Sequence, residues 1–183
     1  MNKINWKFIG GLEGRTLHGY VPDAAKSHSG VTIASGFDIG AVTDEAWPEL
    51  PPWAQQAFAH YRHLHGMAAL GTVHAAPLMI TEEQADQLDA ISAAQTEASL
   101  EHHYKQDANA DFDELPEAVQ TVLASVTFQY GTPWVRCPKF WGCAIKQDYE
   151  GMIAQLNNFG DAYSTRRKAE AEYLEQGTLT NVS

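Results

Sequence analysis

Three polar residues in the first forty have types and spacing suited to acid–base chemistry on a sugar polymer. Glu13 follows Ile9 and Leu12, and these apolar neighbours are expected to desolvate its carboxyl partly. Desolvation favours the protonated form, which a general acid requires. Thr32 and Asp38 follow within short apolar runs. Cleavage of a glycosidic bond needs one carboxyl to protonate the leaving oxygen and a second carboxylate, here with a hydroxyl nearby, to orient water or attack.

Each of these residues also has an ordinary structural interpretation. A glutamate near a helix end is usually without a catalytic role. Threonine is common in strands, so Thr32 fits a plain β-strand. Asp38 lies between glycines, where aspartate is common in turns. The residue types alone therefore leave the chemical and structural interpretations open.

The elements that must position these residues can be predicted from the apolar pattern. Ile9 and Leu12 lie at helical spacing, and glycines end that segment, so a short helix is expected to present Glu13 at its C-terminal end. Short β-branched or aromatic stretches follow, with the turn-rich loop PDAAKSHS between the first two. They predict a small antiparallel sheet. The predicted helix and extended segments are 5–14, 17–21, 30–35 and 36–40.

The pattern becomes helical from residue 52 onward. Trp53, Ala57, Tyr61 and Leu64 form one apolar stripe. Residues 66–78 have little pattern and are interpreted as a loop or a frayed helix. The sequence Thr81-Glu82-Glu83-Gln84 is typical of a capping box, and it opens a helix that is expected to reach about His103. Residues 106–114 form an acidic connector.

Three further helices are predicted in the remainder of the chain. One begins at Pro116 and ends at Gly131, and its nearly continuous apolar character predicts that it is central and buried. The second covers 149–156, with Gly160 as its stop. The third runs from about Thr165 to Gln176, with Gly177 as the residue after its end, and residues 178–183 form a tail.

The predicted fold class is therefore α+β, mostly α, in one domain spanning 1–183. A β-containing lobe is expected over about 14–50 and a helical lobe over about 52–177. A cleft between two such lobes is a common place for a site.

Composition and charge argue against several classes of function. The 183 residues include 12 Lys plus Arg and 23 Asp plus Glu, which gives a net charge of −11. Such an acidic chain is poorly suited to nucleic acid, and an anionic membrane would repel it on average. No apolar run approaches 18 residues, so no membrane insertion is expected, and the N-terminus has no secretory signal. We therefore expect synthesis in the cytoplasm, and delivery by another domain or machine if the protein acts elsewhere.

Histidines and cysteines give no metal-binding pattern. His60, His63, His65 and the pair His102–His103 form neither a His-Glu-x-x-His motif nor a frame of paired ligands, so no metal or other cofactor is expected. The two cysteines, Cys137 and Cys143, are too few for a disulfide framework and are interpreted as free thiols. The aromatic residues around them, Trp134, Phe140 and Trp141, fit core packing better than a sugar-stacking platform.

The chain resembles the phage-type lysozymes, and most closely their pesticin-like muramidase branch. The segments KFIGGLEGRTLHGYVP and SGVTIASGFDIG resemble that family's catalytic lobe, in which a glutamate closing the first helix precedes a T-I-x-x-G strand. Three later segments resemble its long connecting helix, its central buried helix and its R-R-x-x-E helix, namely ITEEQADQL, LPEAVQTVLASVTFQYG and STRRKAEAEYLEQG. The resemblance covers most of residues 5–177 in the family's order and implies a two-lobed lysozyme-like fold.

The resemblance implies roles for individual residues. Glu13 matches the family's acid, and Thr32 matches the hydroxyl of the T-I-x-x-G strand. In the pesticin-like branch the second carboxylate comes six residues after the threonine, and this position is Asp38 here. Ordinary phage lysozymes place the second carboxylate between the glutamate and the threonine, and Asp23 lies there in this chain. Asp38 is preferred and Asp23 is the alternative.

The resemblance also implies roles in the helical part of the chain. Phe128 and Gln129 match the end of the central helix that faces the substrate cleft. Arg166 and Arg167 match structural arginines that anchor the last helix to the domain.

The resemblance implies a muramidase that cleaves the β-1,4 bond between N-acetylmuramic acid and N-acetylglucosamine, with inversion and without a cofactor. Its substrate is the glycan strand of peptidoglycan in the cell wall or periplasm, and we expect a monomer. A phage endolysin and an antibacterial toxin or effector both fit, the latter with an immunity protein or a delivery domain as partner. Two rivals stay open: a lysozyme-like module that binds without cutting, and a metal-dependent hydrolase that chelators would inhibit.

Overall fold

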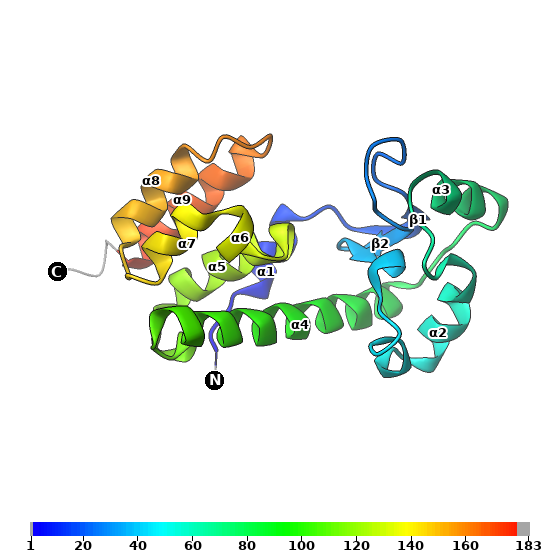
Figure 1. Ribbon diagram of the computed structural model, residues 1–183, viewed down its shortest axis with the longest axis horizontal. Helices are drawn as coiled ribbons and strands as arrows, with labels where there is room; N and C mark the ends of the chain where they lie inside the picture. The colour runs from blue at the N-terminus through cyan, green and yellow to red at the C-terminus, as the bar shows by residue number, and fades with distance from the viewer. Residues whose placement is uncertain (1, 179–183) are drawn as a thin grey trace. The chain divides into compact units, whose positions relative to one another are not determined.

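The computed structural model describes residues 2–178, so the predicted tail lies outside the described residues except for Thr178 (Figure 1). The structure is 63% helical with a small three-stranded antiparallel sheet, which confirms the predicted fold class. None of the helices within residues 2–178 is long and apolar enough to cross a membrane.

The elements follow one another in this order, with η marking a short 3-10 helix: α1 (Trp6–Leu12), β1 (Thr16–Tyr20), β2 (Thr32–Ala34), β3 (Phe37–Asp38), η1 (Ile39–Ala41), η2 (Trp47–Glu49), α2 (Pro52–Phe58), η3 (Ala59–Tyr61), α3 (Gly66–Ala75), α4 (Glu82–Ala108), η4 (Phe112–Glu114), α5 (Glu117–Tyr130), α6 (Pro133–Arg136), α7 (Pro138–Ala144), α8 (Tyr149–Asn157) and α9 (Ser164–Thr178).

The chain divides into two compact units. One runs from Glu13 to Ile91, and the other joins the residues up to Leu12 to those from Ser92 onward. The boundary between the two units falls inside α4, whereas the boundary between lobes that the sequence pattern predicts lies near residue 51. The reason is that α2, α3 and the start of α4 supply the apolar side chains that cover the sheet, including Phe58, Val73 and Leu88.

The sheet has the strand order β1-β2-β3, with both pairs antiparallel, as the sequence predicts. Thr32 is the Cα partner of Tyr20 on one side and of Asp38 on the other. The register between β1 and β2 shifts between Thr16 and Tyr20, which marks an irregularity in β1. The outer edge of β1 pairs with the segment before α4, where the Gly19 amide donates to the Leu78 carbonyl at 2.9 Å.

Two helical predictions between residues 52 and 78 need correction. The stripe ending at Leu64 does not form one helix, because α2 ends at Phe58, a short 3-10 turn follows, and His63 has a φ of +60°. The segment interpreted as a loop or frayed helix contains the ordered helix α3. Its Gly and Ala residues give little amphipathic signal, yet alanine favours helix and buried Ala69 packs into the core.

The capping box predicted at the start of α4 is present. The Thr81 amide donates to the Gln84 side-chain oxygen at 2.9 Å, and the Gln84 amide donates to the Thr81 hydroxyl at 3.2 Å. These bonds satisfy amides that the first helical turn leaves unpaired. The helix continues to Ala108, beyond the predicted end near His103.

Helix α5 forms the buried centre of the other unit. All residues from Ala118 to Thr127 are buried, and Gly131, with a φ of +73°, ends the helix as predicted. The prediction that Gly177 follows the last helix is wrong, because α9 continues through it to Thr178. A Cβ at Gly177 would lie 2.2 Å from the Ala118 Cβ, so this glycine allows α9 to approach α5 closely.

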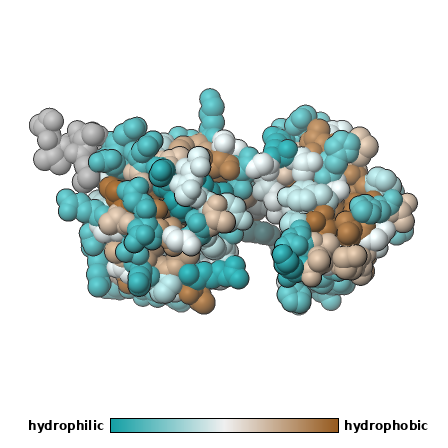
Figure 2. Space-filling view, turned by 90° about the horizontal axis from the view of Figure 1, so that it is seen from above, coloured by the Kyte–Doolittle hydropathy of each residue, from teal (hydrophilic) through white to brown (hydrophobic). Residues whose placement is uncertain are grey.

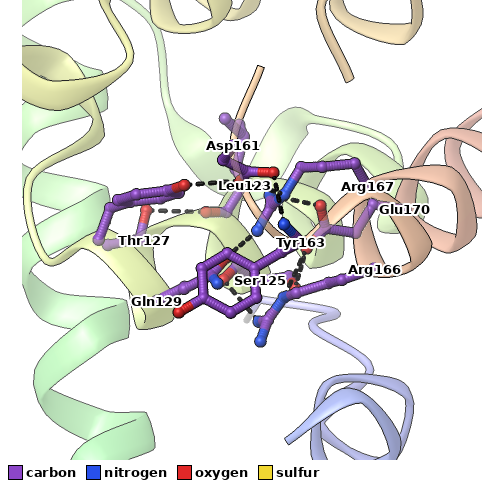
Figure 3. A network of polar contacts seen from close by, with 10 residues as sticks. Leu123, Ser125, Thr127, Gln129, Asp161, Tyr163, Arg166, Arg167 and Glu170 are labelled. Atoms are coloured by element: carbon purple, nitrogen blue, oxygen red, sulfur yellow. Dashed lines mark hydrogen bonds and ion pairs between the residues drawn. The ribbon is translucent and has the colours of Figure 1, made fainter. Parts of the chain in front are cut away.

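A buried polar network joins α9 to α5 (Figure 3). Glu170, fully buried, accepts a hydrogen bond from the Ser125 hydroxyl at 2.6 Å and forms ion pairs with Arg166 and Arg167. Burial raises the pKa of Glu170, while the two guanidinium groups and the hydroxyl oppose that shift. Removing one partner from such a network typically costs about 3–5 kcal/mol, because it leaves a buried charge uncompensated. The expected structural role of the two arginines is thus confirmed.

The cysteine-containing segment is part of the core of the same unit. Cys137 and Cys143 are free thiols, as predicted, and burial raises the pKa of each. Phe140 and Trp141 are almost completely buried, which confirms core packing rather than a sugar platform for these two rings.

Candidate active site

Glu13 lies directly after α1, in a half-buried position. Both sides of it are anchored. Before it, Ile9 is buried in the hydrophobic core of its unit. After it, the Arg15 guanidinium donates to an Asp86 carboxylate oxygen at 2.6 Å and to the Glu82 carbonyl at 3.0 Å, both on α4. Glu13 is therefore the first residue of its unit, and on its C-terminal side it is held to α4 of the same unit through Arg15.

Thr32 and Asp38 are brought together by the sheet. They are direct partners across β2 and β3. Side chains of such partners project from the same face of a sheet, with Cβ atoms about 4.5–5.5 Å apart. Thr32 is 4% exposed and its hydroxyl lies 3.4 Å from the Gly30 carbonyl, whereas Asp38 is half-buried. A hydroxyl and a carboxylate thus lie next to each other on one face of the sheet, and both groups can hydrogen-bond to water.

Backbone amides fix the orientation of the Asp38 carboxylate. Its Oδ1 accepts hydrogen bonds from the Gly30 amide at 3.0 Å and the Gly40 amide at 2.9 Å. Its Oδ2 is 3.1 Å from the same Gly30 amide. Charge-assisted bonds of this kind are stronger than neutral ones, so the carboxylate has little freedom to rotate.

The two glycines are required for this arrangement. A Cβ at Gly30 would lie 2.6 Å from the Asp38 carboxylate and 2.6 Å from the Gly40 Cα. A Cβ at Gly40 would lie 2.5 Å from the Leu64 carbonyl oxygen. Backbone atoms cannot move aside as a side-chain end can, so a side chain at either glycine would displace the carboxylate.

If this site hydrolyses peptidoglycan, as the resemblance implies, the Gly30→Ala variant is expected to lose most of that activity, about tenfold or more, and to lose about 1–3 kcal/mol of stability through overpacking. A 1 Å displacement of a reacting group has effects of that order on rate. Initial rates on purified peptidoglycan and urea unfolding measure the two effects. Gly71→Ala is the matched control, since a Cβ there meets nothing within 4 Å. Full activity in the Gly30→Ala variant would contradict this account of Asp38.

Asp23, the alternative second carboxylate, occupies a different environment. It is exposed and has a φ of +41° in the turn that follows β1. Its backbone carbonyl accepts from the amides of Lys26 and Ser27 at 2.8 Å each. Asp23 thus shapes a surface turn, and the sheet pairs Thr32 with Asp38 instead.

Phe128 and Gln129, the predicted substrate contacts, belong to the other unit. Phe128 is half-buried and packs edge-to-face against Trp6, with ring centroids 6.1 Å apart. The Gln129 side-chain oxygen accepts a hydrogen bond from Arg167, as Figure 3 shows. The substrate-binding role of both residues stays a prediction.

Sequence reasoning missed Gly30, Gly40 and Arg15. The two glycines flank the motif that carries Thr32 and Asp38, and glycine often marks a close backbone approach, so a signal was present. Arg15 gave no signal, because its partners on α4 lie about 70 positions away in the chain. Among the described residues, no three His, Cys, Asp or Glu side chains group as metal ligands would.

Comparison with known proteins gives one family. Residues 3–150 match the Pesticin family, described as "Bacterial toxin homologue of phage lysozyme, C-term". The match includes the whole segment from Glu13 to Asp38. A comparison with curated protein sequences finds no match.

Proposed function

Because the chain belongs to the Pesticin family of bacterial toxin homologues of phage lysozyme, we propose that it cleaves the β-1,4 bond between N-acetylmuramic acid and N-acetylglucosamine. Membership supports a lysozyme-like peptidoglycan hydrolase at the level of the family. The observation that supports glycosidic bond cleavage by this chain is the pairing of Thr32 with an Asp38 carboxylate held by two backbone amides. A module that only binds glycan has no need for a carboxylate fixed in this way.

In this proposal Glu13 is the general acid. It protonates the oxygen of the leaving sugar while the bond to the anomeric carbon breaks. Asp38 accepts a proton from a water molecule that the Thr32 hydroxyl helps to orient, and the water oxygen attacks the anomeric carbon. The negative charge of Asp38 also stabilises the oxocarbenium-like transition state. The orientation that the Gly30 and Gly40 amides impose on Asp38 suits both tasks, because no reorganisation is needed during the reaction.

Mass spectrometry of the fragments released from purified peptidoglycan tests the cleavage site. A muramidase leaves N-acetylmuramic acid at the new reducing ends. Reducing N-acetylglucosamine would indicate a glucosaminidase, anhydro-muramic ends would indicate a lytic transglycosylase, and no release would indicate a binding module. Glu13→Gln protein is the control for contaminating hydrolases. Activity that persists in a chelator would remove the metal-dependent alternative.

We expect inversion, because the Thr32 hydroxyl beside Asp38 leaves room for a water molecule but would crowd a direct attack by the carboxylate. Inverting enzymes keep their two carboxyl groups about 6.5–9.5 Å apart for the same reason. The first product from the β-linked chain is then the α-anomer. Proton NMR of the new reducing end, recorded before mutarotation, measures this, and an initial β-anomer would overturn the water-orienting role of Thr32.

The proposed place of action is the bacterial cell wall. A net charge of −11 is unfavourable on a polyanionic wall, which supports delivery by another domain or machine. An antibacterial toxin or effector, with an immunity protein in the producing cell, fits the family's description better than an endolysin does. We propose that the chain acts there as a monomer.

A further inference from the structure

Tyr20 occupies the position next to the candidate catalytic pair in the sheet. It is the last residue of β1 and the direct partner of Thr32, which is in turn the partner of Asp38. Direct partners project from the same face, so the side chains of Tyr20, Thr32 and Asp38 form a row across three strands. Neighbouring strands are about 4.8 Å apart, which places the Tyr20 backbone roughly 10 Å from that of Asp38. Tyr20 is thus close enough to contact a glycan strand that passes Asp38.

The Tyr20 side chain is open to solvent. It is 44% exposed, although large apolar and aromatic side chains in this unit are mostly buried. Apolar residues do reach the surface of the unit in places, among hydrophilic ones (Figure 2). Within residues 2–178 no other ring stacks on Tyr20 and no side chain bonds its hydroxyl. An aromatic face is thus available for a ligand.

A groove of about 400 Å³ lies beside Tyr20, between β1 and α3. Its apolar lining comes from Leu70, Val73, Pro77 and Leu78, and the imidazoles of His18 and His74 supply its polar groups. Gly19 allows β1 to lie close to this lining, because a Cβ there would be 3.0 Å from the Leu78 Cβ and 3.3 Å from Val73.

The chemistry of the groove favours a neutral, amphipathic ring. Its lining contains no Asp, Glu, Lys or Arg, although the chain as a whole carries a charge of −11. An N-acetylated amino sugar has apolar C–H faces that pack on an aromatic ring, a methyl group that fits an apolar pocket, and hydroxyls that pair with imidazole nitrogens. A phosphate or a carboxylate would find no cation here other than a protonated histidine.

We infer that Tyr20 and the groove beside it bind an N-acetylated sugar ring of the glycan strand, on the β1 side of the bond that is cleaved. The inference rests on the proposed function, since it assumes that the strand passes Asp38. Tyr20 supplies stacking area in this role, and Glu13 and Asp38 supply the acid–base chemistry.

Binding without cleavage gives the most direct test. In Glu13→Gln protein, calorimetry measures the Kd for a soluble hexamer of N-acetylglucosamine. Tyr20→Ala should raise that Kd about 5–10-fold, the range that about 1–1.4 kcal/mol of stacking gives. Tyr20→Phe should leave it within about twofold, because the ring and not the hydroxyl makes the contact. Tyr163→Ala is the matched control, since Tyr163 is also exposed, at 54%, and belongs to the other unit.

Three results would overturn the inference: an unchanged Kd in Tyr20→Ala, an equal loss in Tyr163→Ala, and no hexamer binding by the Glu13→Gln parent. If Tyr20→Ala does not fold, ring NMR signals of Tyr20 in the Glu13→Gln protein decide, since the hexamer must shift them. Hydrolysis separates this inference from the proposed function. If Tyr20→Ala cleaves peptidoglycan as fast as the wild type, the inference about Tyr20 is overturned and the proposed function stands. If the wild type does not cleave peptidoglycan, the proposed function is overturned. The Kd measurements then decide whether Tyr20 binds the sugar.

Discussion

Glu13→Gln protein is expected to hydrolyse peptidoglycan at least ~10²-fold more slowly than the wild type, which is the lower range of what general acid catalysis contributes. Glutamine keeps the size of the side chain and its hydrogen-bonding capacity, but it has no proton to transfer to the leaving oxygen. Turbidity loss of a cell-wall suspension measures the rate. The melting temperature should stay level or rise, because functional carboxyl groups in half-buried positions are often a local cost to stability.

A matched control for this variant is Glu45→Gln, since Glu45 is exposed and belongs to the same unit. It should lyse walls at the wild-type rate. Near-normal lysis by Glu13→Gln would refute the assignment of the acid. Equal losses in both variants would indicate that net charge, and not proton transfer, limits the assay.

Asp38→Asn should be as inactive as Glu13→Gln, with a loss of at least ~10²-fold, whereas Asp23→Asn should keep most of the activity. The structure makes this a clean comparison. An asparagine oxygen in the place of Oδ1 can keep the bonds from the Gly30 and Gly40 amides, and only the longer bond from the Gly30 amide to Oδ2 is lost. Loss of rate then reports on the missing negative charge. Steady-state rates of both variants on the same peptidoglycan, with melting curves alongside, measure the difference.

The reverse result has a definite meaning. An active Asp38→Asn and an inactive Asp23→Asn would assign Asp38 to the local structure and move the second carboxylate to the loop after β1. That outcome would also require the exposed turn around Asp23 to reach the substrate.

Local rules predicted the parts of the fold that local interactions decide. The Thr81–Gln84 capping box and the Gly131 end of α5 depend on a few neighbouring residues, so the sequence was enough. Helix α3 was not recognised, because its burial depends on contacts with the sheet and leaves no clear period in the sequence. Gly177 was misinterpreted for the same kind of reason, since its role is set by Ala118, about 60 positions earlier.

The candidate site shows the same limit. Residue types and spacing singled out Glu13, Thr32 and Asp38, and strand pairing could be anticipated for the last two. Spacing could not show that the Gly30 and Gly40 amides converge on one carboxylate, because that depends on a close approach of two backbone segments. Nor could spacing show that Tyr20 lies in the same row as Thr32 and Asp38, because the register between β1 and β2 shifts along the strand.

The position of the first twelve residues affects the order in which the protein can fold. The Lys3 amide donates to the Gln120 side chain at 2.7 Å, the Asn5 amide donates to the Thr121 hydroxyl at 2.9 Å, and Ile9 packs in the same unit as these partners. On a growing chain the Lys3 and Asn5 amides lack these partners until α5 has been synthesised, whereas the unit from Glu13 to Ile91 is one continuous stretch. Contacts of such long sequence separation form late, because the entropy of closing the loop must be overcome first. Glu13 is made long before α5, yet the segment that holds it on its N-terminal side cannot be fixed until α5 is available.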